Sequence, residues 1–176
     1  DVSLVGSEMC IRDSNKVAWI TGGGTGIGSE LTKRLVDKGW HVIISGRRIK
    51  KLKEVQKFKK SNIQVYPLDI TNEEECNLVF NEIISLFKKI DLIILNAASY
   101  NPGHLNFEKT SSIKSVINTN LMGQIHCLKY VLSQMKIQGF GQIVFVSSPA
   151  GFRGLPNSGI YGVTKSALTF LAESLY

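Results

Sequence analysis

A glycine-rich segment follows a short apolar run near the start of the chain. The run is VAWI at residues 17–20, and residues 21–28 read TGGGTGIG. The spacing Gly22-x-x-x-Gly26-x-Gly28 fits neither the Gly-x-Gly-x-x-Gly pattern nor the phosphate loop of NTPases. A glycine loop between a strand and a helix nevertheless favours phosphate binding, because the backbone can approach closely and the free amides of the helix start attract charge.

After residue 16, five short apolar runs alternate with five longer amphipathic ones. Strands are predicted at residues 17–20, 41–45, 63–67, 91–95 and 142–146, and helices at residues 26–38, 50–59, 72–89, 111–138 and 158–176. The nearly all-apolar runs are typical of parallel strands that are buried on both faces. The pattern predicts one domain over residues 16–176, an α/β doubly wound parallel sheet of the Rossmann type. Thr71 and Glu74 form a capping-box pattern that would open the third helix.

Composition excludes several functions. The chain has a net charge of +7, but its densest lysine group falls on residues 50–60, which we interpret as a solvated helix face and not as a nucleic-acid site. No apolar run approaches the roughly 18 residues that span a bilayer. The cysteines and histidines have no metal-ligand spacing, so we expect no disulfide framework, no metal and a cytoplasmic location. They are Cys10, Cys76, Cys127, His41, His104 and His126.

Both ends of the chain are unusual. Residues 1–15 have no helical or strand period and lack the character of a signal peptide. We expect them to be a non-native or disordered leader. The last amphipathic run stops at Tyr176 without a cap, so the chain is expected to be cut at both ends.

Six motifs follow one another in the order of a known family. They are Thr21-Gly22-x-x-x-Gly26-Ile27-Gly28, LDIT at 68–71, NAAS at 96–99, NTNLMG at 118–123, VSSPAG at 146–151 and YGVTK at 161–165. Together they resemble the short-chain dehydrogenase/reductase family in its compact single-domain form. The chain departs from the family at Ala98, which replaces the glycine of an Asn-Ala-Gly element.

The resemblance implies that the glycine loop binds a nicotinamide dinucleotide. It implies that Asp69 bonds the adenine amino group and that Ile70 packs on the adenine ring. The cofactor-binding residues that follow from it are Thr21, Gly22, Gly26, Ile27, Gly28, Asp69, Ile70, Asn96, Ala97, Tyr161 and Lys165.

The resemblance also implies a catalytic tetrad of Asn120, Ser148, Tyr161 and Lys165. Tyr161 and Lys165 are four residues apart and share a helix face, so the ammonium would stabilise the phenolate of an acid–base tyrosine. Ser148 would polarise the substrate carbonyl, with Ser147 as the less favoured neighbour. Asn120 would hold a water in a proton relay to Lys165; alternatively, it caps or bridges backbone groups.

The end of the second predicted strand bears on the choice of cofactor. Gly46 stands where NAD-preferring relatives place a carboxylate, and Arg47 and Arg48 follow. A guanidinium offers a 2′-phosphate a fork of donors, and Ser45 could add a hydrogen bond. Cations at a helix start are otherwise unfavourable, which weakens the alternative that the arginines are mere surface charge. We therefore expect NADP(H), with NAD less favoured.

The predicted function is an oxidoreductase that transfers hydride between NADP(H) and a small carbonyl or alcohol substrate, with Tyr161 as the acid–base group. The alternative is a non-catalytic dinucleotide-binding module, such as a redox sensor or scaffold. Residues 99–110 and 149–159 are expected to border the substrate pocket. The resemblance further implies a homodimer or homotetramer and a longer C-terminal part, so we expect the sheet to be incomplete at its C-terminal end and residues 1–176 alone to be inactive.

Overall fold

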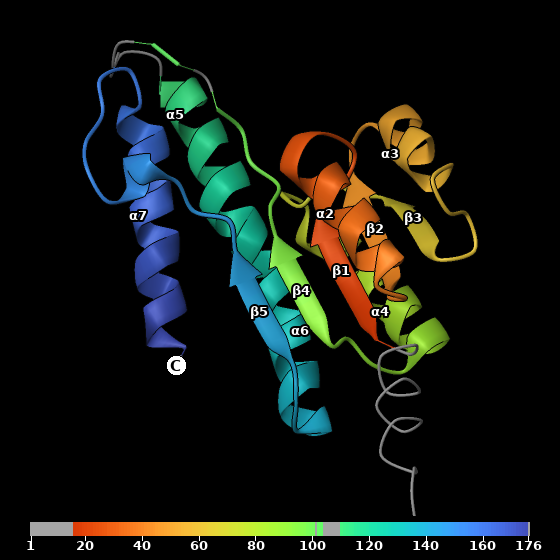
Figure 1. Ribbon diagram of the computed structural model, residues 1–176. Coiled ribbons are helices and arrows are strands. Elements are labelled where there is room, and N and C mark those ends of the chain that lie inside the picture. Colours follow the sequence, from red (N-terminus) through yellow and green to blue (C-terminus); the bar gives the residue numbers. More distant parts are fainter. Residues whose placement is uncertain (1–15, 101, 104–109, 176) are drawn as a thin grey trace, which may run out of the picture.

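A five-stranded parallel sheet forms the centre of the protein (Figure 1). The computed structural model describes residues 16–100, 102–103 and 110–175, so the expectation for residues 1–15 lies outside the described part. The strands are ordered β3-β2-β1-β4-β5, and each neighbouring pair is parallel. They are β1 (Val17–Thr21), β2 (His41–Gly46), β3 (Ile63–Pro67), β4 (Leu92–Leu95) and β5 (Gln142–Phe145). All five predicted strands are present, with ends that differ by at most one residue.

Helices cover both faces of this sheet, which confirms the predicted doubly wound α/β class. α2 and α3 pack on one face, and α4 and α6 pack on the other. α7 lies beside α5 (Figure 1). The helices are α2 (Gly26–Asp37), α3 (Ile49–Gln56), α4 (Glu73–Phe87), α5 (Thr110–Ile117), α6 (Gly123–Gln138) and α7 (Gly159–Ser174).

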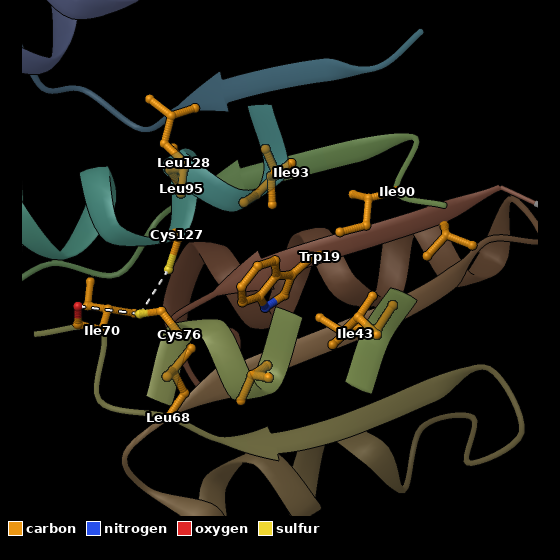
Figure 2. Close-up of a cluster of buried hydrophobic side chains, with 14 of the residues drawn as sticks. Trp19, Ile43, Leu68, Ile70, Cys76, Ile90, Ile93, Leu95, Cys127 and Leu128 are labelled. Carbon is orange, nitrogen blue, oxygen red and sulfur yellow. Dashed lines mark hydrogen bonds between the residues drawn. The ribbon is translucent and has the colours of Figure 1, made fainter. Parts of the chain in front are cut away.

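The three central strands, β2, β1 and β4, are largely apolar because both of their faces are buried. Trp19, Ile43 and Ile93 come from three adjacent strands and lie in the cluster beneath α4 and α6 (Figure 2). Their neighbours Ile20 and Ile44 belong to the opposite cluster, beneath α2 and α3. This is the alternation of faces that a β-strand imposes, and here it requires an apolar side chain at each position.

The long helix predicted over residues 111–138 is interrupted. α5 ends at Ile117, Asn118–Met122 form a π-helix (η1), and α6 begins at Gly123. The π-helix contains the fully buried Asn120, whose side-chain amide bonds backbone and side-chain groups of other segments. The Asn120 amide must point inward to reach these partners. The wider turn of the π-helix changes the direction of this side chain from the one that a regular α-helix would give it.

The cap of α4 also differs from the sequence prediction. Asn72 is the N-cap, and its Oδ1 accepts hydrogen bonds from the backbone N–H groups of Glu74 and Glu75 at 3.0 and 3.2 Å. Thr71 instead donates its hydroxyl to Asp69 Oδ1 at 2.9 Å. The capping box at Thr71 was therefore wrong by one residue, because the threonine hydroxyl is engaged in the preceding turn.

We expect Asn72→Ala to lower the free energy of unfolding by about 1 kcal/mol, because two backbone donors at the start of α4 lose their acceptor. Urea denaturation monitored by circular dichroism measures this. Asn81→Ala, on the exposed face of the same helix, serves as the control and should change the value by less than about 0.5 kcal/mol. Equal losses from both variants would contradict the assigned cap.

Candidate functional site

A buried hydroxyl joins the ends of β1 and β4. Thr21 Oγ1 accepts hydrogen bonds from the backbone N–H groups of Asn96 and Ala97, both at 3.1 Å. In return, Asn96 Nδ2 donates to the carbonyl oxygens of Thr21 and Gly22, at 3.0 and 3.2 Å. Thr21 was predicted to contact the cofactor, but its side chain is fully buried and serves this connection.

The glycine loop leaves β1 in a tight turn that only small residues allow. Gly22 has φ 69°, and its N–H donates to Ser45 O at 2.7 Å. A Cβ on Gly28, in the first turn of α2, would lie 2.5 Å from Gly22 O and 2.7 Å from Asn96 Nδ2. The start of α2 is thereby brought against the loop and the end of β4, with Gly26 and the exposed Ile27 at the surface beside them.

A cavity of about 400 Å³ opens at the carboxyl ends of the central strands. This size lies within the range of pockets that hold small ligands and cofactors. Residues predicted to bind the cofactor form part of its wall, namely Gly22, Arg47, Arg48, Asp69, Ile70, Asn96 and Ala97. The other lining residues were not among those predicted to bind the cofactor, and they are Gly24, Thr25, Gly46, Lys51, Leu52, Leu68, Ala98 and Thr119.

Asp69 and Ile70 form the end of the cavity near β3. Asp69 Oδ1 accepts hydrogen bonds from the backbone N–H and the hydroxyl of Thr71, at 3.0 and 2.9 Å, and this fixes the carboxylate. Asp69 N–H donates to Glu75 Oε2 at 2.9 Å. The Ile70 carbonyl lies 3.0 Å from His126 Nδ1. An apolar side chain beside a fixed carboxylate suits a flat ring that carries an amino group.

Three cations surround the same cavity. Arg47, Arg48 and Lys51 all line it, and Arg48 Nη2 donates to Oγ1 of Thr25 in the glycine loop at 3.0 Å. Lys51 was interpreted from the sequence as part of a solvated face. Its position three residues after Arg48, on the same side of a helix, was the signal that could have identified it. Lys51 Nζ also contacts Glu54 Oε2 at 2.9 Å.

Ser45 does not present its hydroxyl to the cavity, contrary to expectation. Its side chain is fully buried, and Ser45 Oγ accepts a hydrogen bond from Trp19 Nε1 at 3.0 Å. The alternation of β2 turns this side chain toward the cluster under α4 and α6. Ser45 instead contributes its backbone carbonyl, which accepts from Gly22 N and Gly23 N at 2.7 and 3.2 Å.

Asn120 connects the residues after β4 to α7. Its Oδ1 accepts from Ser99 N at 2.7 Å, and its Nδ2 donates to Ser99 O at 2.9 Å and to Thr164 Oγ1 at 3.2 Å. The Thr164 hydroxyl in turn donates to Tyr161 O at 2.7 Å. Asn120 therefore bridges backbone groups, and it ties the segment after β4 to the helix that carries Tyr161 and Lys165.

Lys165 is a buried cation beside a tyrosine ring. Its side chain is 2% exposed, its Nζ donates to Val146 O at 2.6 Å, and Nζ lies 5.6 Å from the centroid of the Tyr161 ring. Burial lowers the pKa of the Lys165 ammonium, because the surroundings solvate the charge less well than water does. Neither residue lines the cavity described above, so the pair lies outside the part of the site that the three cations surround.

The two adjacent serines after β5 have different surroundings. Ser147 Oγ donates to Lys165 O at 3.3 Å and lies 2.9 Å from Thr169 Oγ1, so it packs against α7. Ser148 is the N-cap of a short 3-10 helix (η2, Pro149–Gly151), and its Oγ accepts from Ala150 N at 3.3 Å. Successive side chains of an extended segment point in opposite directions, so only one of the two serines faces α7.

Two cysteines meet next to the cavity wall, although 51 residues separate them. Cys76 Sγ and Cys127 Sγ are 3.7 Å apart, both side chains are buried, and Cys76 Sγ donates to Ile70 O at 3.6 Å (Figure 2). The hydrogen bond with Cys76, together with burial, raises the pKa of the Cys127 thiol well above its usual range. Cys10 lies outside the described residues.

Among residues 16–100, 102–103 and 110–175, no three His, Cys, Asp or Glu side chains gather as a metal site. The same part of the chain contains no helix that combines the length and the apolar character needed to cross a membrane.

A model of the short chain dehydrogenase family matches residues 16–176. The chain belongs to the short-chain dehydrogenase family. It is therefore an oxidoreductase domain, and its glycine loop and cavity lie at the carboxyl ends of the parallel strands, the edge at which doubly wound sheets bind ligands. The cavity fits a nicotinamide cofactor, since the wall combines three cations with a fixed carboxylate, and the glycine at position 28 lets the start of α2 approach the loop where a Cβ would clash with Gly22 O.

Relatives of this short-chain dehydrogenase include an uncharacterized oxidoreductase of Staphylococcus haemolyticus, 29% identical over 92% of this chain and 71% of that protein. Among solved structures, ElxO with NADP bound is 36% identical with a TM-score of 0.84, over 89% of this chain and 65% of ElxO. NAD+-bound xylitol dehydrogenase is 28% identical with a TM-score of 0.86, over 93% of this chain and 65% of that enzyme. The chain thus spans about two thirds of the length of these solved proteins.

We expect Lys165→Met to raise the melting temperature of the cofactor-free protein at about pH 7, because the substitution removes a buried charge. The folded-state pKa of Lys165 is lowered from its ordinary value of 10.5, so the wild type loses the charge first in the folded state as pH rises. The gain in melting temperature of Lys165→Met should therefore become smaller as the pH rises toward the ordinary lysine pKa of 10.5. Scanning fluorimetry across this pH range measures it.

The control for this prediction is Lys129→Met. The hydrogen bond and charge of Glu73 raise the pKa of the Lys129 ammonium, so its stabilising effect is present at neutral pH and is lost as pH rises through its folded-state pKa. Lys129→Met should not raise the melting temperature. A gain of the same size from both substitutions would show that the effect is unrelated to burial.

Proposed function

We propose that the gene product containing this chain is an NADP(H)-dependent carbonyl reductase or alcohol dehydrogenase in which Tyr161 exchanges the proton. One observation carries the proposal: the buried Lys165 ammonium lies 5.6 Å from the Tyr161 ring centroid in a chain of an oxidoreductase family. A charge buried at a cost in stability is typical of a functional group. A protein that only binds a dinucleotide has no need for Tyr161 together with Ser148.

The residues divide the chemistry among themselves. Bound NADPH would supply the hydride for carbonyl reduction. Tyr161 would donate its phenolic proton to the carbonyl oxygen, and the Lys165 charge would stabilise the phenolate that remains. Ser148 would donate a hydrogen bond to the same carbonyl oxygen, because Ser147 is engaged with α7. Asn120 Oδ1 retains a second lone pair that could accept from a water of the proposed relay.

The preference for NADP(H) is supported by charge. Arg47, Arg48 and Lys51 line one cavity, and Gly46 leaves no carboxylate to repel a 2′-phosphate. ElxO, a 36% identical structural neighbour, holds NADP, and a tyrosine-to-phenylalanine variant of ElxO holds NADPH at 35% identity. Xylitol dehydrogenase holds NAD+, so the proposal depends on the cations of this chain and not on the family.

We expect Tyr161→Phe in the full gene product to lower kcat by at least about 100-fold, because the substrate oxygen loses its proton donor. NADPH should bind with a Kd within about threefold of the wild-type value, since the tyrosine hydroxyl contributes at most one hydrogen bond to the cofactor. Steady-state assays with a panel of aldehydes and ketones, together with fluorescence titration of NADPH, measure both quantities.

Tyr66→Phe is the matched control, because Tyr66 lies on β3, away from Tyr161, and should leave the rate unchanged. A Tyr161→Phe enzyme that keeps most of its activity would refute the assignment. Tight NADPH binding by the wild type without turnover of any carbonyl in the panel would support the alternative of a non-catalytic binding module.

We expect Arg47→Ala to weaken NADPH binding about tenfold or more, because a charge-assisted hydrogen bond to the 2′-phosphate contributes about 1.5–3 kcal/mol. NADH binding should change little. Isothermal titration calorimetry measures both constants, and Arg34→Ala, an exposed arginine on α2, is the control. Equal Kd values for NADPH and NADH in the wild type would contradict the proposed preference.

A further inference from the structure

Tyr100 places an aromatic ring against Tyr161 from a distant part of the chain. The two ring centroids are 4.6 Å apart and the rings are inclined at 52°. This distance lies within the favourable range for aromatic pairs. The contact joins the connection that follows β4 to the first turn of α7, so it links the two segments that meet at the proposed reaction centre.

The hydroxyl end of Tyr100 is held as well as its ring. Tyr100 Oη lies 3.2 Å from Oγ of Ser158, a buried residue directly before α7. A second contact joins the same two connections, because Gly103 N–H donates to Asn157 O at 3.1 Å. Tyr100 is thus fixed at both ends of its side chain.

The backbone beside Tyr100 is fixed by the buried Asn120 amide. Ser99 both donates to and accepts from that amide, at 2.7 and 2.9 Å. The same amide reaches Thr164, whose hydroxyl bonds Tyr161 O. Asn120 therefore links the backbone beside Tyr100 to the backbone of Tyr161 through Thr164.

We propose that Tyr100 is a positioning residue for Tyr161 and one wall of the substrate pocket, a role that rests on the proposed function. A tyrosine in the first turn of a helix has more than one allowed rotamer, and the packed Tyr100 ring selects the one in which the hydroxyl meets the substrate. A displacement of the proton donor by about 1 Å is costly to the rate. Tyr100 itself is 50% exposed, which leaves part of its ring to contact the substrate.

The test compares Tyr100→Leu and Tyr100→Phe in the full gene product. Leucine removes the ring contact, so kcat should fall about three- to tenfold, the fold-change that corresponds to losing an aromatic pair. Phenylalanine keeps the ring and should restore most of the loss. The Kd for NADPH should not change, because Tyr100 does not line the cavity at the cations.

Tyr130→Leu is the matched control. Tyr130 also packs on an aromatic ring, Phe80, at 5.8 Å, and its hydroxyl donates to Glu73 Oε1 at 3.4 Å, but it lies outside the site. This variant should lose stability without losing kcat. If Tyr100→Leu and Tyr130→Leu have the same kcat and differ from the wild type only in melting temperature, Tyr100 has a structural role alone and the inference is overturned.

A measurement without substrate separates this inference from the proposed function. The chain has five tyrosines, and in protein labelled with 3-fluorotyrosine the ¹⁹F resonance of Tyr161 is the one lost in Tyr161→Phe. Tyr100→Leu should shift this resonance, whereas Tyr130→Leu should not. If the ¹⁹F resonance of Tyr161 does not shift in Tyr100→Leu, then Tyr100 does not position Tyr161, even if the enzyme is active. Retained turnover in Tyr161→Phe defeats the proposed function itself.

Discussion

The Thr21 hydroxyl holds together the two strands between which the nucleotide cavity opens. Parallel strands end with backbone groups that have no partner in the ladder, and buried groups of this kind must be satisfied by side chains or water. Thr21 and Asn96 satisfy each other, since the hydroxyl accepts two backbone N–H groups and the amide returns two bonds to carbonyls. Four hydrogen bonds within the chain therefore join the end of β1 and the glycine loop to the residues after β4, at the wall of the cavity.

The sequence predicted the sheet well because the three central strands are buried on both faces, and their nearly all-apolar runs are easy to distinguish from amphipathic helices. It predicted Arg47 and Arg48 at the cavity because parallel strands end at one edge. It could not predict the direction of Thr21 or Ser45, since adjacent strand positions face opposite sides and the pattern does not say which side holds the ligand. The π-helix escaped prediction because Ser99, which Asn120 bonds, is 21 residues away in sequence.

The two halves of the site are built by different means. The end that suits an adenosine phosphate is an open cavity lined by three cations. One of these cations, Lys51, was not recognised from the sequence because it lies in a lysine-rich helix. The end with Tyr161 is assembled from packed segments, in which Lys165 is buried against the Val146 carbonyl. A protein selected for stability alone would not bury this ammonium, so under the proposed function Lys165 marks a trade-off between stability and activity.

The contact between Cys76 and Cys127 makes the packing of α4 against α6 observable. Both thiols are buried and a raised pKa keeps the Cys127 thiol protonated, whereas alkylating reagents attack the thiolate. Neither sulfur can react until the two helices separate. The rate of modification at these positions therefore reports how often this layer opens, in the way that amide exchange reports local unfolding. Because Cys76 also bonds the carbonyl of Ile70, a residue of the cavity wall, the layer that this rate reports on lies directly beside the cavity.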